Sequence, residues 1–183
     1  MTRVLGFAGS LRKDSYNRAL LRAARELAAP EGIDVEIFEL DGIPPYNQDD
    51  EAALPAAVRD FKSRIKQADA LLLVTPEYNY SVSGVLKNAI DWASRPYGAN
   101  SFDDKPVAIM GVTVGTLGTA RAQYHLRQML VYVNAYPLNG PEVMVSAAAD
   151  KFRDGELIDE YTRHKVREQL VALAAWAHRL HPD

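Results

Sequence analysis

The segment RVLGFAGSLRKDSYN, residues 3–17, joins a short apolar run to a loop dense in polar side chains. The run is rich in Val, Leu and Phe, which is typical of a buried strand. After the loop, Leu20, Ala24 and Leu27 recur at steps of four and three, which predicts a helix with one apolar face. Residues 3–27 therefore predict a strand, a polar loop and a helix.

The rest of the chain continues this alternation of strands and helices. A helix is predicted by the spacing of Leu54, Val58, Phe61 and Ile65, and a long C-terminal helix by the run from Val166 to Leu180. This pattern predicts an α/β fold, a parallel sheet with helices on both faces. The further strands are predicted at DVEIFEL (34–40), ALLLVT (70–75), PVAIMGVTV (106–114) and, less clearly, YPLNGPEVMV (136–145).

Composition limits the classes of function. A chain of 183 residues, 48% of them hydrophobic, is expected to form one domain over residues 1–183. A net charge of -3 offers no basic field for nucleic acid. The apolar run near the N-terminus is too short for a signal peptide or a membrane span, so we expect a cytoplasmic protein without a membrane partner. With no cysteine, any redox role must depend on a bound cofactor.

The loop after the first predicted strand suits a phosphate group. Ser10 and Ser15 offer hydroxyl donors, Arg12 offers a guanidinium, and the following helix offers free backbone N–H groups at its start. Neither a Walker loop nor a Gly-x-Gly-x-x-Gly turn is present. The competing interpretation is that Ser15 or Asn17 caps the helix and that Arg12 is a solvated charge.

The stretch TPEYNYSVSGVLKNAIDWASRP, residues 75–96, follows the third predicted strand. Tyr78, Asn79, Tyr80 and Ser81 place rings and polar groups where an aromatic, polar-edged ligand such as isoalloxazine would lie. Pro, Asn and Ser are also ordinary turn formers, which is the alternative reading. Further along, Leu86, Ile90 and Trp92 are predicted to be core residues, and no Gly-x-Ser-x-Gly elbow is present.

A third loop, TVGTLGTAR at residues 113–121, contains two glycines that allow close backbone approach to a planar ligand or merely serve a turn. The four histidines, His125, His164, His178 and His181, lack metal-ligand spacing, so we expect surface or helix-end roles and no metal site. Asp49 and Asp50 are adjacent and are expected in a solvated loop.

Four separated motifs together resemble those of the NADPH-dependent FMN reductase family, the flavodoxin-like flavoproteins that include bacterial quinone, chromate and azo-dye reductases. The resemblance covers roughly residues 3 to 145. It implies a flavodoxin-like three-layer sandwich with a five-stranded parallel sheet in the order 2-1-3-4-5. The motifs are GSLRKDSYNRAL (9–20), IPPYNQDDE (43–51), the stretch 75–96 and GTLGTARAQYHLRQML (115–130).

The same resemblance implies a cofactor site. The FMN phosphate would be held by the first loop, the isoalloxazine would lie along the second, and the third would approach its other side. No side chain acts as a catalytic acid or base, because the flavin N5 carries the hydride. The implied cofactor-binding residues are Ser10, Arg12, Ser15, Tyr16 and Asn17, then Pro76, Glu77, Tyr78, Asn79, Tyr80 and Ser81, then Thr113 and Gly115.

The implied function is an NAD(P)H oxidoreductase that passes two electrons through FMN to quinones, or to azo, nitro or chromate compounds, by a ping-pong mechanism. The protein would be a homodimer or homotetramer. Two alternatives stay open: a flavodoxin-type carrier of single electrons, and an FMN-binding redox sensor without turnover. The chain departs from the family pattern at Ser83, where Pro is common and a looser helix entry is expected, and at Thr119, where a second Gly is common.

Overall fold

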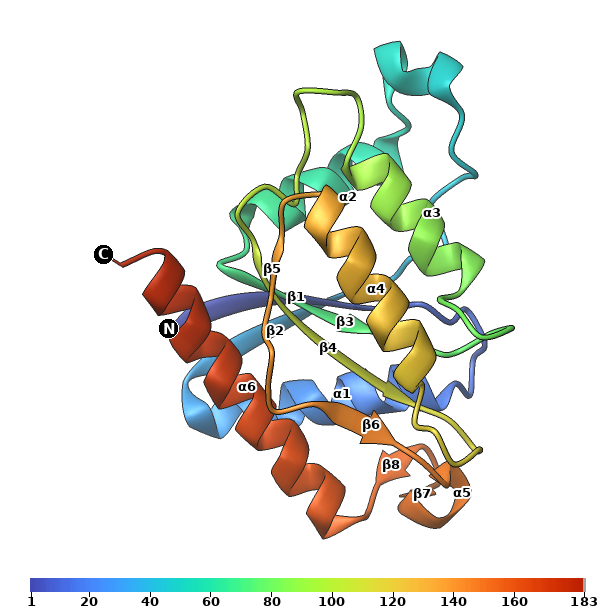
Figure 1. Cartoon of the computed structure of the whole chain (residues 1–183), viewed down its shortest axis with the longest axis vertical. Helices are drawn as coiled ribbons and strands as arrows, with labels where there is room; N and C mark the ends of the chain where they lie inside the picture. The colour runs from blue at the N-terminus through green and yellow to red at the C-terminus, as the bar shows by residue number, and fades with distance from the viewer. Residues whose placement is uncertain (183) are drawn as a thin grey trace.

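The computed structural model describes residues 1–182 and shows alternating strands and helices (Figure 1). The elements are β1 (Thr2–Ala8), α1 (Tyr16–Ala28), η1 (Ala29–Glu31), β2 (Ile33–Phe38), η2 (Gln48–Ala53), α2 (Ala56–Gln67), β3 (Ala70–Val74), α3 (Gly84–Ala93), β4 (Pro106–Val112), α4 (Ala120–Tyr132), β5 (Tyr136–Pro137), β6 (Val143–Val145), α5 (Ala148–Lys151), β7 (Phe152–Arg153), β8 (Glu156–Leu157) and α6 (Glu160–Leu180). None of the helices among residues 1–182 is long and apolar enough to cross a bilayer.

The main sheet is parallel, and its order β2-β1-β3-β4-β5 confirms the prediction. The fifth position differs in detail, because the strand expected at residues 136–145 is split into β5 and β6, both paired with β4. Pro137 and Pro141 cannot donate a ladder hydrogen bond, which accounts for the interruption. A separate antiparallel hairpin, β7–β8, was not predicted, although its Asp154-Gly155 turn is a recognised hairpin signal.

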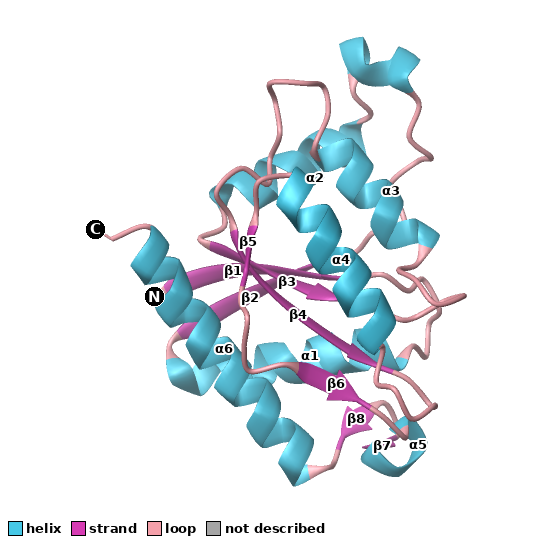
Figure 2. Ribbon diagram, viewed as in Figure 1, coloured by secondary structure: helices cyan, strands magenta, loops and turns pink. Residues whose placement is uncertain are grey.

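Helices cover both faces of the sheet (Figure 2). Helices α1 and α6 lie on one face, and α2, α3 and α4 lie on the other. The strand side chains divide accordingly, since successive residues of a strand point to opposite faces. In β3, Leu72 packs with the α1 and α6 layer, while Leu71 and Leu73 pack with the other helices. The result is the three-layer flavodoxin-like sandwich.

The predicted core residues are buried. Leu86, Ile90 and Trp92 of α3 are at most 2% exposed, and the Trp92 indole N–H donates to the carbonyl of Pro44 at 2.8 Å. Asp49 and Asp50 lie exposed in η2, as expected for a solvated loop. Helix α6 occupies the predicted C-terminal stretch, and its N-cap Asp159 accepts from the backbone N–H of Thr162 at 2.8 Å.

A buried lysine joins α2 to the end of α3. The Nζ atom of Lys62 donates to the carbonyl oxygens of Ala93 at 2.9 Å, Arg95 at 2.5 Å and Ala99 at 2.9 Å. Carbonyls at the end of a helix lack intrahelical donors, so the ammonium supplies bonds that α3 cannot form internally. Burial lowers the pKa of Lys62 to about 8, so the side chain is still mostly charged at pH 7.

We expect Lys62→Met to lower the free energy of unfolding by about 1–3 kcal/mol, because the half-buried carbonyl groups of Arg95 and Ala99 lose a charged donor and that of Ala93 keeps only the Ser101 N–H. Urea unfolding at pH 7 measures the change. Lys66→Met is the matched control, since Lys66 is exposed on the same helix, and it should change stability by less than about 0.5 kcal/mol. Equal stability of the two variants would contradict this role for Lys62.

Candidate functional site

Three loops leave β1, β3 and β4 at the carboxyl edge of the sheet, and the loops after β1 and β3 contact each other there (Figure 1). The Gly9 N–H donates to the carbonyl of Val74 at 2.9 Å, and the Ser83 hydroxyl donates to the carbonyl of Gly9 at 2.6 Å. The Tyr78 hydroxyl lies 3.5 Å from the Ser10 hydroxyl. The structure therefore brings together the first two groups of residues that the sequence singled out.

The loop after β1 carries several hydrogen-bond donors at the start of α1, although the Arg12 guanidinium donates to the Asp14 carbonyl. Ser10 and Ser15 are buried, and Ser15 caps α1 by accepting from the Arg18 N–H at 3.4 Å. The first N–H groups of α1, those of Tyr16 and Asn17, have no partner within the helix. Arg12 is exposed, and its guanidinium lies 5.8 Å from the centre of the Tyr16 ring. This donor set fits a phosphate dianion.

Two residues expected in this set direct their side chains elsewhere. The Asn17 amide donates to the carbonyl of Val112 at 3.0 Å and accepts from the Val112 N–H at 3.0 Å. Its side chain therefore ties α1 to the end of β4, and only its backbone N–H is left for an anion. The Tyr16 ring packs against Phe152 with 5.4 Å between ring centres, on the side of the β7–β8 hairpin.

The loop after β3 forms a tight turn. Tyr78 and Ser81 exchange two backbone hydrogen bonds of 3.0 Å, and Asn79 and Tyr80 between them have φ values of 50° and 68°. Positive φ is unfavourable for a bulky residue such as tyrosine, so the surrounding contacts hold this turn in place. Tyr78, Asn79 and Tyr80 are exposed, whereas Pro76 is buried. The turn presents its rings and amide outward at the sheet edge.

Glu77 connects this turn to α4. Its carboxylate accepts from the backbone N–H groups of Arg121 at 3.1 Å and Ala122 at 3.3 Å and pairs with the Arg121 guanidinium. The guanidinium in turn lies 3.6 Å from the centre of the Tyr80 ring. The Glu77 side chain is only 8% exposed. Glu77 is expected along the flavin ring, but its carboxylate is hydrogen-bonded to the N-terminus of α4.

The loop after β4 is tied to the chain that follows β6. Thr113 donates its N–H to the carbonyl of Val145 at 2.9 Å, and its hydroxyl accepts from the Gly115 N–H at 3.3 Å. Thr119 is buried with a φ of 67°, a conformation in which glycine costs less. A Cβ added at Gly111 would lie 2.1 Å from the Thr119 hydroxyl and 2.4 Å from the Thr75 carbonyl oxygen, so only glycine fits there.

The expectation that Ser83 loosens the entry to α3 is wrong. The Ser83 hydroxyl accepts from the Leu86 N–H at 3.2 Å, which makes it the N-cap of α3, and it also donates to the carbonyl of Gly9. Its side chain is buried. Ser83 therefore tightens the helix start and fastens it to the loop after β1.

Two side chains of α4, those of Arg121 and His125, also contact the loop after β3, which the sequence does not predict. His125, expected to have a surface role, is exposed, yet its Nδ1 atom lies 3.0 Å from the Ser81 hydroxyl. Arg121 makes the contacts with Glu77 and Tyr80 described above. One signal was available for the Glu77 contact: α4 has no acid in its first turn and no side-chain cap of its own, so its free N–H groups needed an acceptor from elsewhere.

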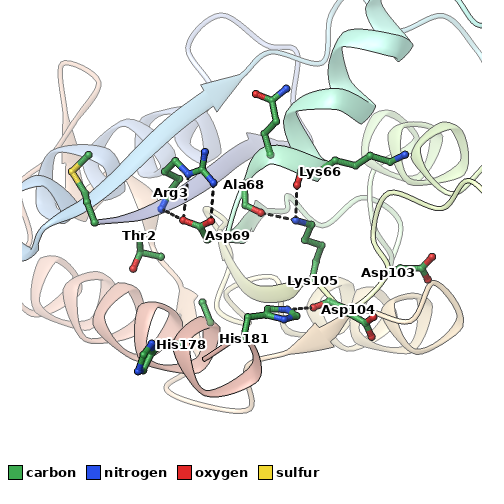
Figure 3. Close-up of a pocket in the computed structure, with 13 residues that line it drawn as sticks. Thr2, Arg3, Lys66, Ala68, Asp69, Asp103, Asp104, Lys105, His178 and His181 are labelled. Atoms are coloured by element: carbon green, nitrogen blue, oxygen red, sulfur yellow. Dashed lines mark hydrogen bonds and ion pairs between the residues drawn. The ribbon is translucent and has the colours of Figure 1, made fainter. Parts of the chain in front are cut away.

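A polar cavity of about 560 Å³ lies at the opposite edge of the sheet, near the start of β1 and β4 (Figure 3). Several of its charged side chains already have partners. Arg3 and Asp69 form an ion pair of 3.0 Å, and Lys105 donates to the carbonyls of Lys66 and Ala68. Ligands of open parallel sheets bind beyond the carboxyl ends of the strands, so the three-loop edge is the better candidate.

Comparison with known proteins agrees with this geometry. The model of the family described as NADPH-dependent FMN reductase matches residues 2–150. The chain belongs to this family. FMN is therefore its cofactor, and a reduced nicotinamide coenzyme is its electron donor.

Relatives of this FMN reductase extend over nearly the whole chain. An NAD(P)H-dependent FMN reductase of Pseudomonas aeruginosa is 53% identical over 180 residues, which is 97% of this chain and 96% of that protein. A 2-hydroxy-1,4-benzoquinone reductase of a Burkholderia species is 43% identical over 92% of both chains. The solved structure of FerB, a flavoenzyme NAD(P)H:(acceptor) oxidoreductase of Paracoccus denitrificans, has a TM-score of 0.90 and 37% identity over 98% of both chains.

For this FMN reductase we expect Glu77→Gln to lower the free energy of unfolding by about 1–3 kcal/mol, because a charged hydrogen-bond acceptor is lost at the start of α4. Binding of FMN, measured by fluorescence titration, should weaken because the 78–81 turn loses its anchor. Glu26→Gln serves as the control, since Glu26 is exposed on α1. If Glu77→Gln leaves both stability and FMN affinity unchanged, the contact with α4 does not hold the turn.

Proposed function

We propose that this protein catalyses the two-electron reduction of quinones by NADPH or NADH, with FMN held at the three-loop edge. One observation carries the proposal: the buried serines of the first loop, the strained turn at Asn79 and Tyr80, and the loop at Gly115 lie at the ends of β1, β3 and β4. These strand ends meet at the switch point of the sheet, where the order reverses between β1 and β3. The quinone reductases among the relatives support the choice of acceptor.

Each loop has a defined part in holding the cofactor. Ser10, Ser15 and Arg12 bind the phosphate together with the backbone N–H groups of Tyr16 and Asn17. In this proposal, the backbone of the 76–81 segment orients the ring, and Thr113 and Gly115 approach it from the side of β4. When bound, FMN supplies a group that takes two electrons from the reduced nicotinamide and passes them to an acceptor, which predicts ping-pong kinetics.

In this proposal the side chains of the site bind and orient the cofactor, and none of them is needed as a nucleophile. Glu77 is engaged by α4, and Asn17 is engaged by Val112. Backbone and side-chain N–H donors near the pyrimidine edge of the ring stabilise the negative charge that gathers there on reduction. Because Tyr78 and Tyr80 lie exposed beside the site, one side stays accessible to flat acceptors. Azo and nitro compounds, and chromate as a small oxyanion, are included as acceptors because this side is open.

We also propose that the protein is a homodimer or homotetramer. Four large side chains from α4 to β5, those of Tyr124, Val131, Tyr132 and Tyr136, are between 39% and 75% exposed. Clusters of exposed aromatic and aliphatic side chains mark protein interfaces more often than free surface. The same helix carries Arg121 and His125, so such an interface would lie next to the flavin.

The purified protein should be yellow with bound FMN and should be bleached under anaerobic conditions by NADPH or NADH. The reduced protein is then mixed with each acceptor in a stopped-flow spectrometer, and the rates of re-oxidation are compared. The acceptors are 1,4-benzoquinone, an azo dye, a nitro compound, chromate and a one-electron acceptor. We expect benzoquinone to be the fastest two-electron acceptor, with parallel lines in double-reciprocal plots. Colourless protein that does not take up FMN, or bound FMN that neither coenzyme reduces, would overturn the proposal.

A further inference from the structure

A second cavity lies on the far side of the phosphate loop. It has a volume of about 470 Å³ and lies between the start of α1 and the β7–β8 hairpin. The side chains that matter in its wall are those of Arg12, Asp14, Tyr16, Arg22, Phe152 and Asp154. Figure 1 shows the hairpin below the start of α1, at the same end of the sheet as the loops of the flavin site. The flavin site proposed above uses Arg12 and Ser15 of this wall but neither Arg22 nor the hairpin.

Arg22 is the cation in this wall that has no part in the flavin site. Its side chain is half-buried, and its only recorded hydrogen bond among residues 1–182 is a long one of 3.5 Å to the carbonyl of Gly155. It forms no ion pair with an acidic side chain in that part of the chain. A guanidinium with most of its donors unused is suited to bind a phosphate group through two parallel hydrogen bonds.

The cavity also has an aromatic side chain, Tyr16, in its wall, backed by Phe152. The rings of Tyr16 and Phe152 pack with 5.4 Å between their centres at an angle of 54°, and Phe152 itself is buried. The guanidinium of Arg12 lies 5.8 Å from the centre of the Tyr16 ring. Aromatic rings beside guanidinium groups provide stacking partners for a nucleotide base. The Tyr16 ring, which the family resemblance places among the FMN-binding residues, also lines this cavity.

Two carboxylates balance the two arginines. Asp14 and Asp154 line the cavity, and neither is paired with a basic side chain among residues 1–182. The wall therefore carries charges of both signs and does not favour a ligand that is only an anion. A ligand that fits must offer hydrogen-bond donors as well as negative charge, as the amino group and ribose hydroxyls of an adenosine phosphate do.

The cavity borders the flavin site at the loop after β1. It shares Arg12 and Ser15 with the phosphate loop. On its other side, the hairpin follows α5, and Ala148 at the start of α5 donates its N–H to the carbonyl of Thr113 at 3.2 Å. A coenzyme whose nicotinamide lies over the flavin could therefore reach the cavity with its other end.

We propose that this cavity binds the adenosine end of the coenzyme and that Arg22 binds the 2′-phosphate that distinguishes NADPH from NADH. The inference rests on the proposed function, because it assigns a specificity residue to the same reaction. Tyr16 and Phe152 offer the face for adenine, and Asp14 and Asp154 accept from its amino group and ribose hydroxyl. Arg22 then gives a preference for NADPH without touching the flavin.

Equilibrium binding of two coenzyme fragments tests the proposal without any turnover. Isothermal calorimetry with the FMN-loaded protein compares adenosine 2′,5′-bisphosphate with adenosine 5′-monophosphate. The bisphosphate should bind at least about tenfold more tightly, and Arg22→Gln should remove this difference, since a charged bidentate contact contributes about 10- to 100-fold. Arg22→Lys should keep part of it. Arg25→Gln, an exposed position one turn along α1, should change neither affinity.

Steady-state kinetics separates this inference from the proposed function. In Arg22→Gln the ratio of kcat/KM for NADPH to that for NADH should fall at least about tenfold through KM, with kcat for NADH and FMN affinity unchanged. A wild-type protein that binds both fragments equally, or an Arg22→Gln variant with an unchanged coenzyme ratio and full turnover, would overturn the inference alone. Failure of every variant to oxidise either coenzyme would instead overturn the proposed function.

Discussion

The close packing of Gly9 against the loop after β3 is the constraint on which the site depends. A Cβ at this position would lie 2.7 Å from the Ser83 hydroxyl and 3.2 Å from the Pro76 Cδ atom. Any larger residue would push the two loops apart. With glycine there, the Ser83 hydroxyl reaches the Gly9 carbonyl, and Ser10 follows at the edge of the sheet. The loop after β1 and the turn at 78–81 thus keep a fixed separation.

Because the sheet is parallel, this contact lies at the edge where the other loops of the site also begin. Parallel strands end at one edge, so loops far apart in the sequence meet there, as Gly9 and Ser83 do across 74 residues. Three long-range bonds then fix their relative positions: Asn17 joins α1 to β4, Ser83 joins α3 to β1, and Glu77 joins the β3 loop to α4. Each bond satisfies a backbone group at the end of a helix or strand that has no partner within its own element. The strained turn at Tyr80 persists because these bonds surround it.

Much of this architecture was predictable from the sequence, and the failures have identifiable causes. Apolar periodicity located β1 to β4 and α6, because buried faces impose their period on the chain. It could not show that Pro137 and Pro141 divide the last strand, nor that the Asn17 amide meets Val112, which is 95 residues away. The contact between His125 and Ser81 depends on how α4 packs beside the turn. Residue type indicated a polar group at Glu77 but not where its carboxylate points.

The central claim is that the loop after β1 recognises the phosphate of FMN. Its most direct test compares FMN with riboflavin, which differ only in that phosphate, by binding each to wild-type apoprotein and to the Arg12→Ala, Ser15→Ala double variant. The wild type should bind FMN at least about 100-fold more tightly, and the double variant should lose most of this preference, since charged hydrogen bonds contribute about 1.5–3 kcal/mol each. An equal preference for FMN in both proteins would contradict the account.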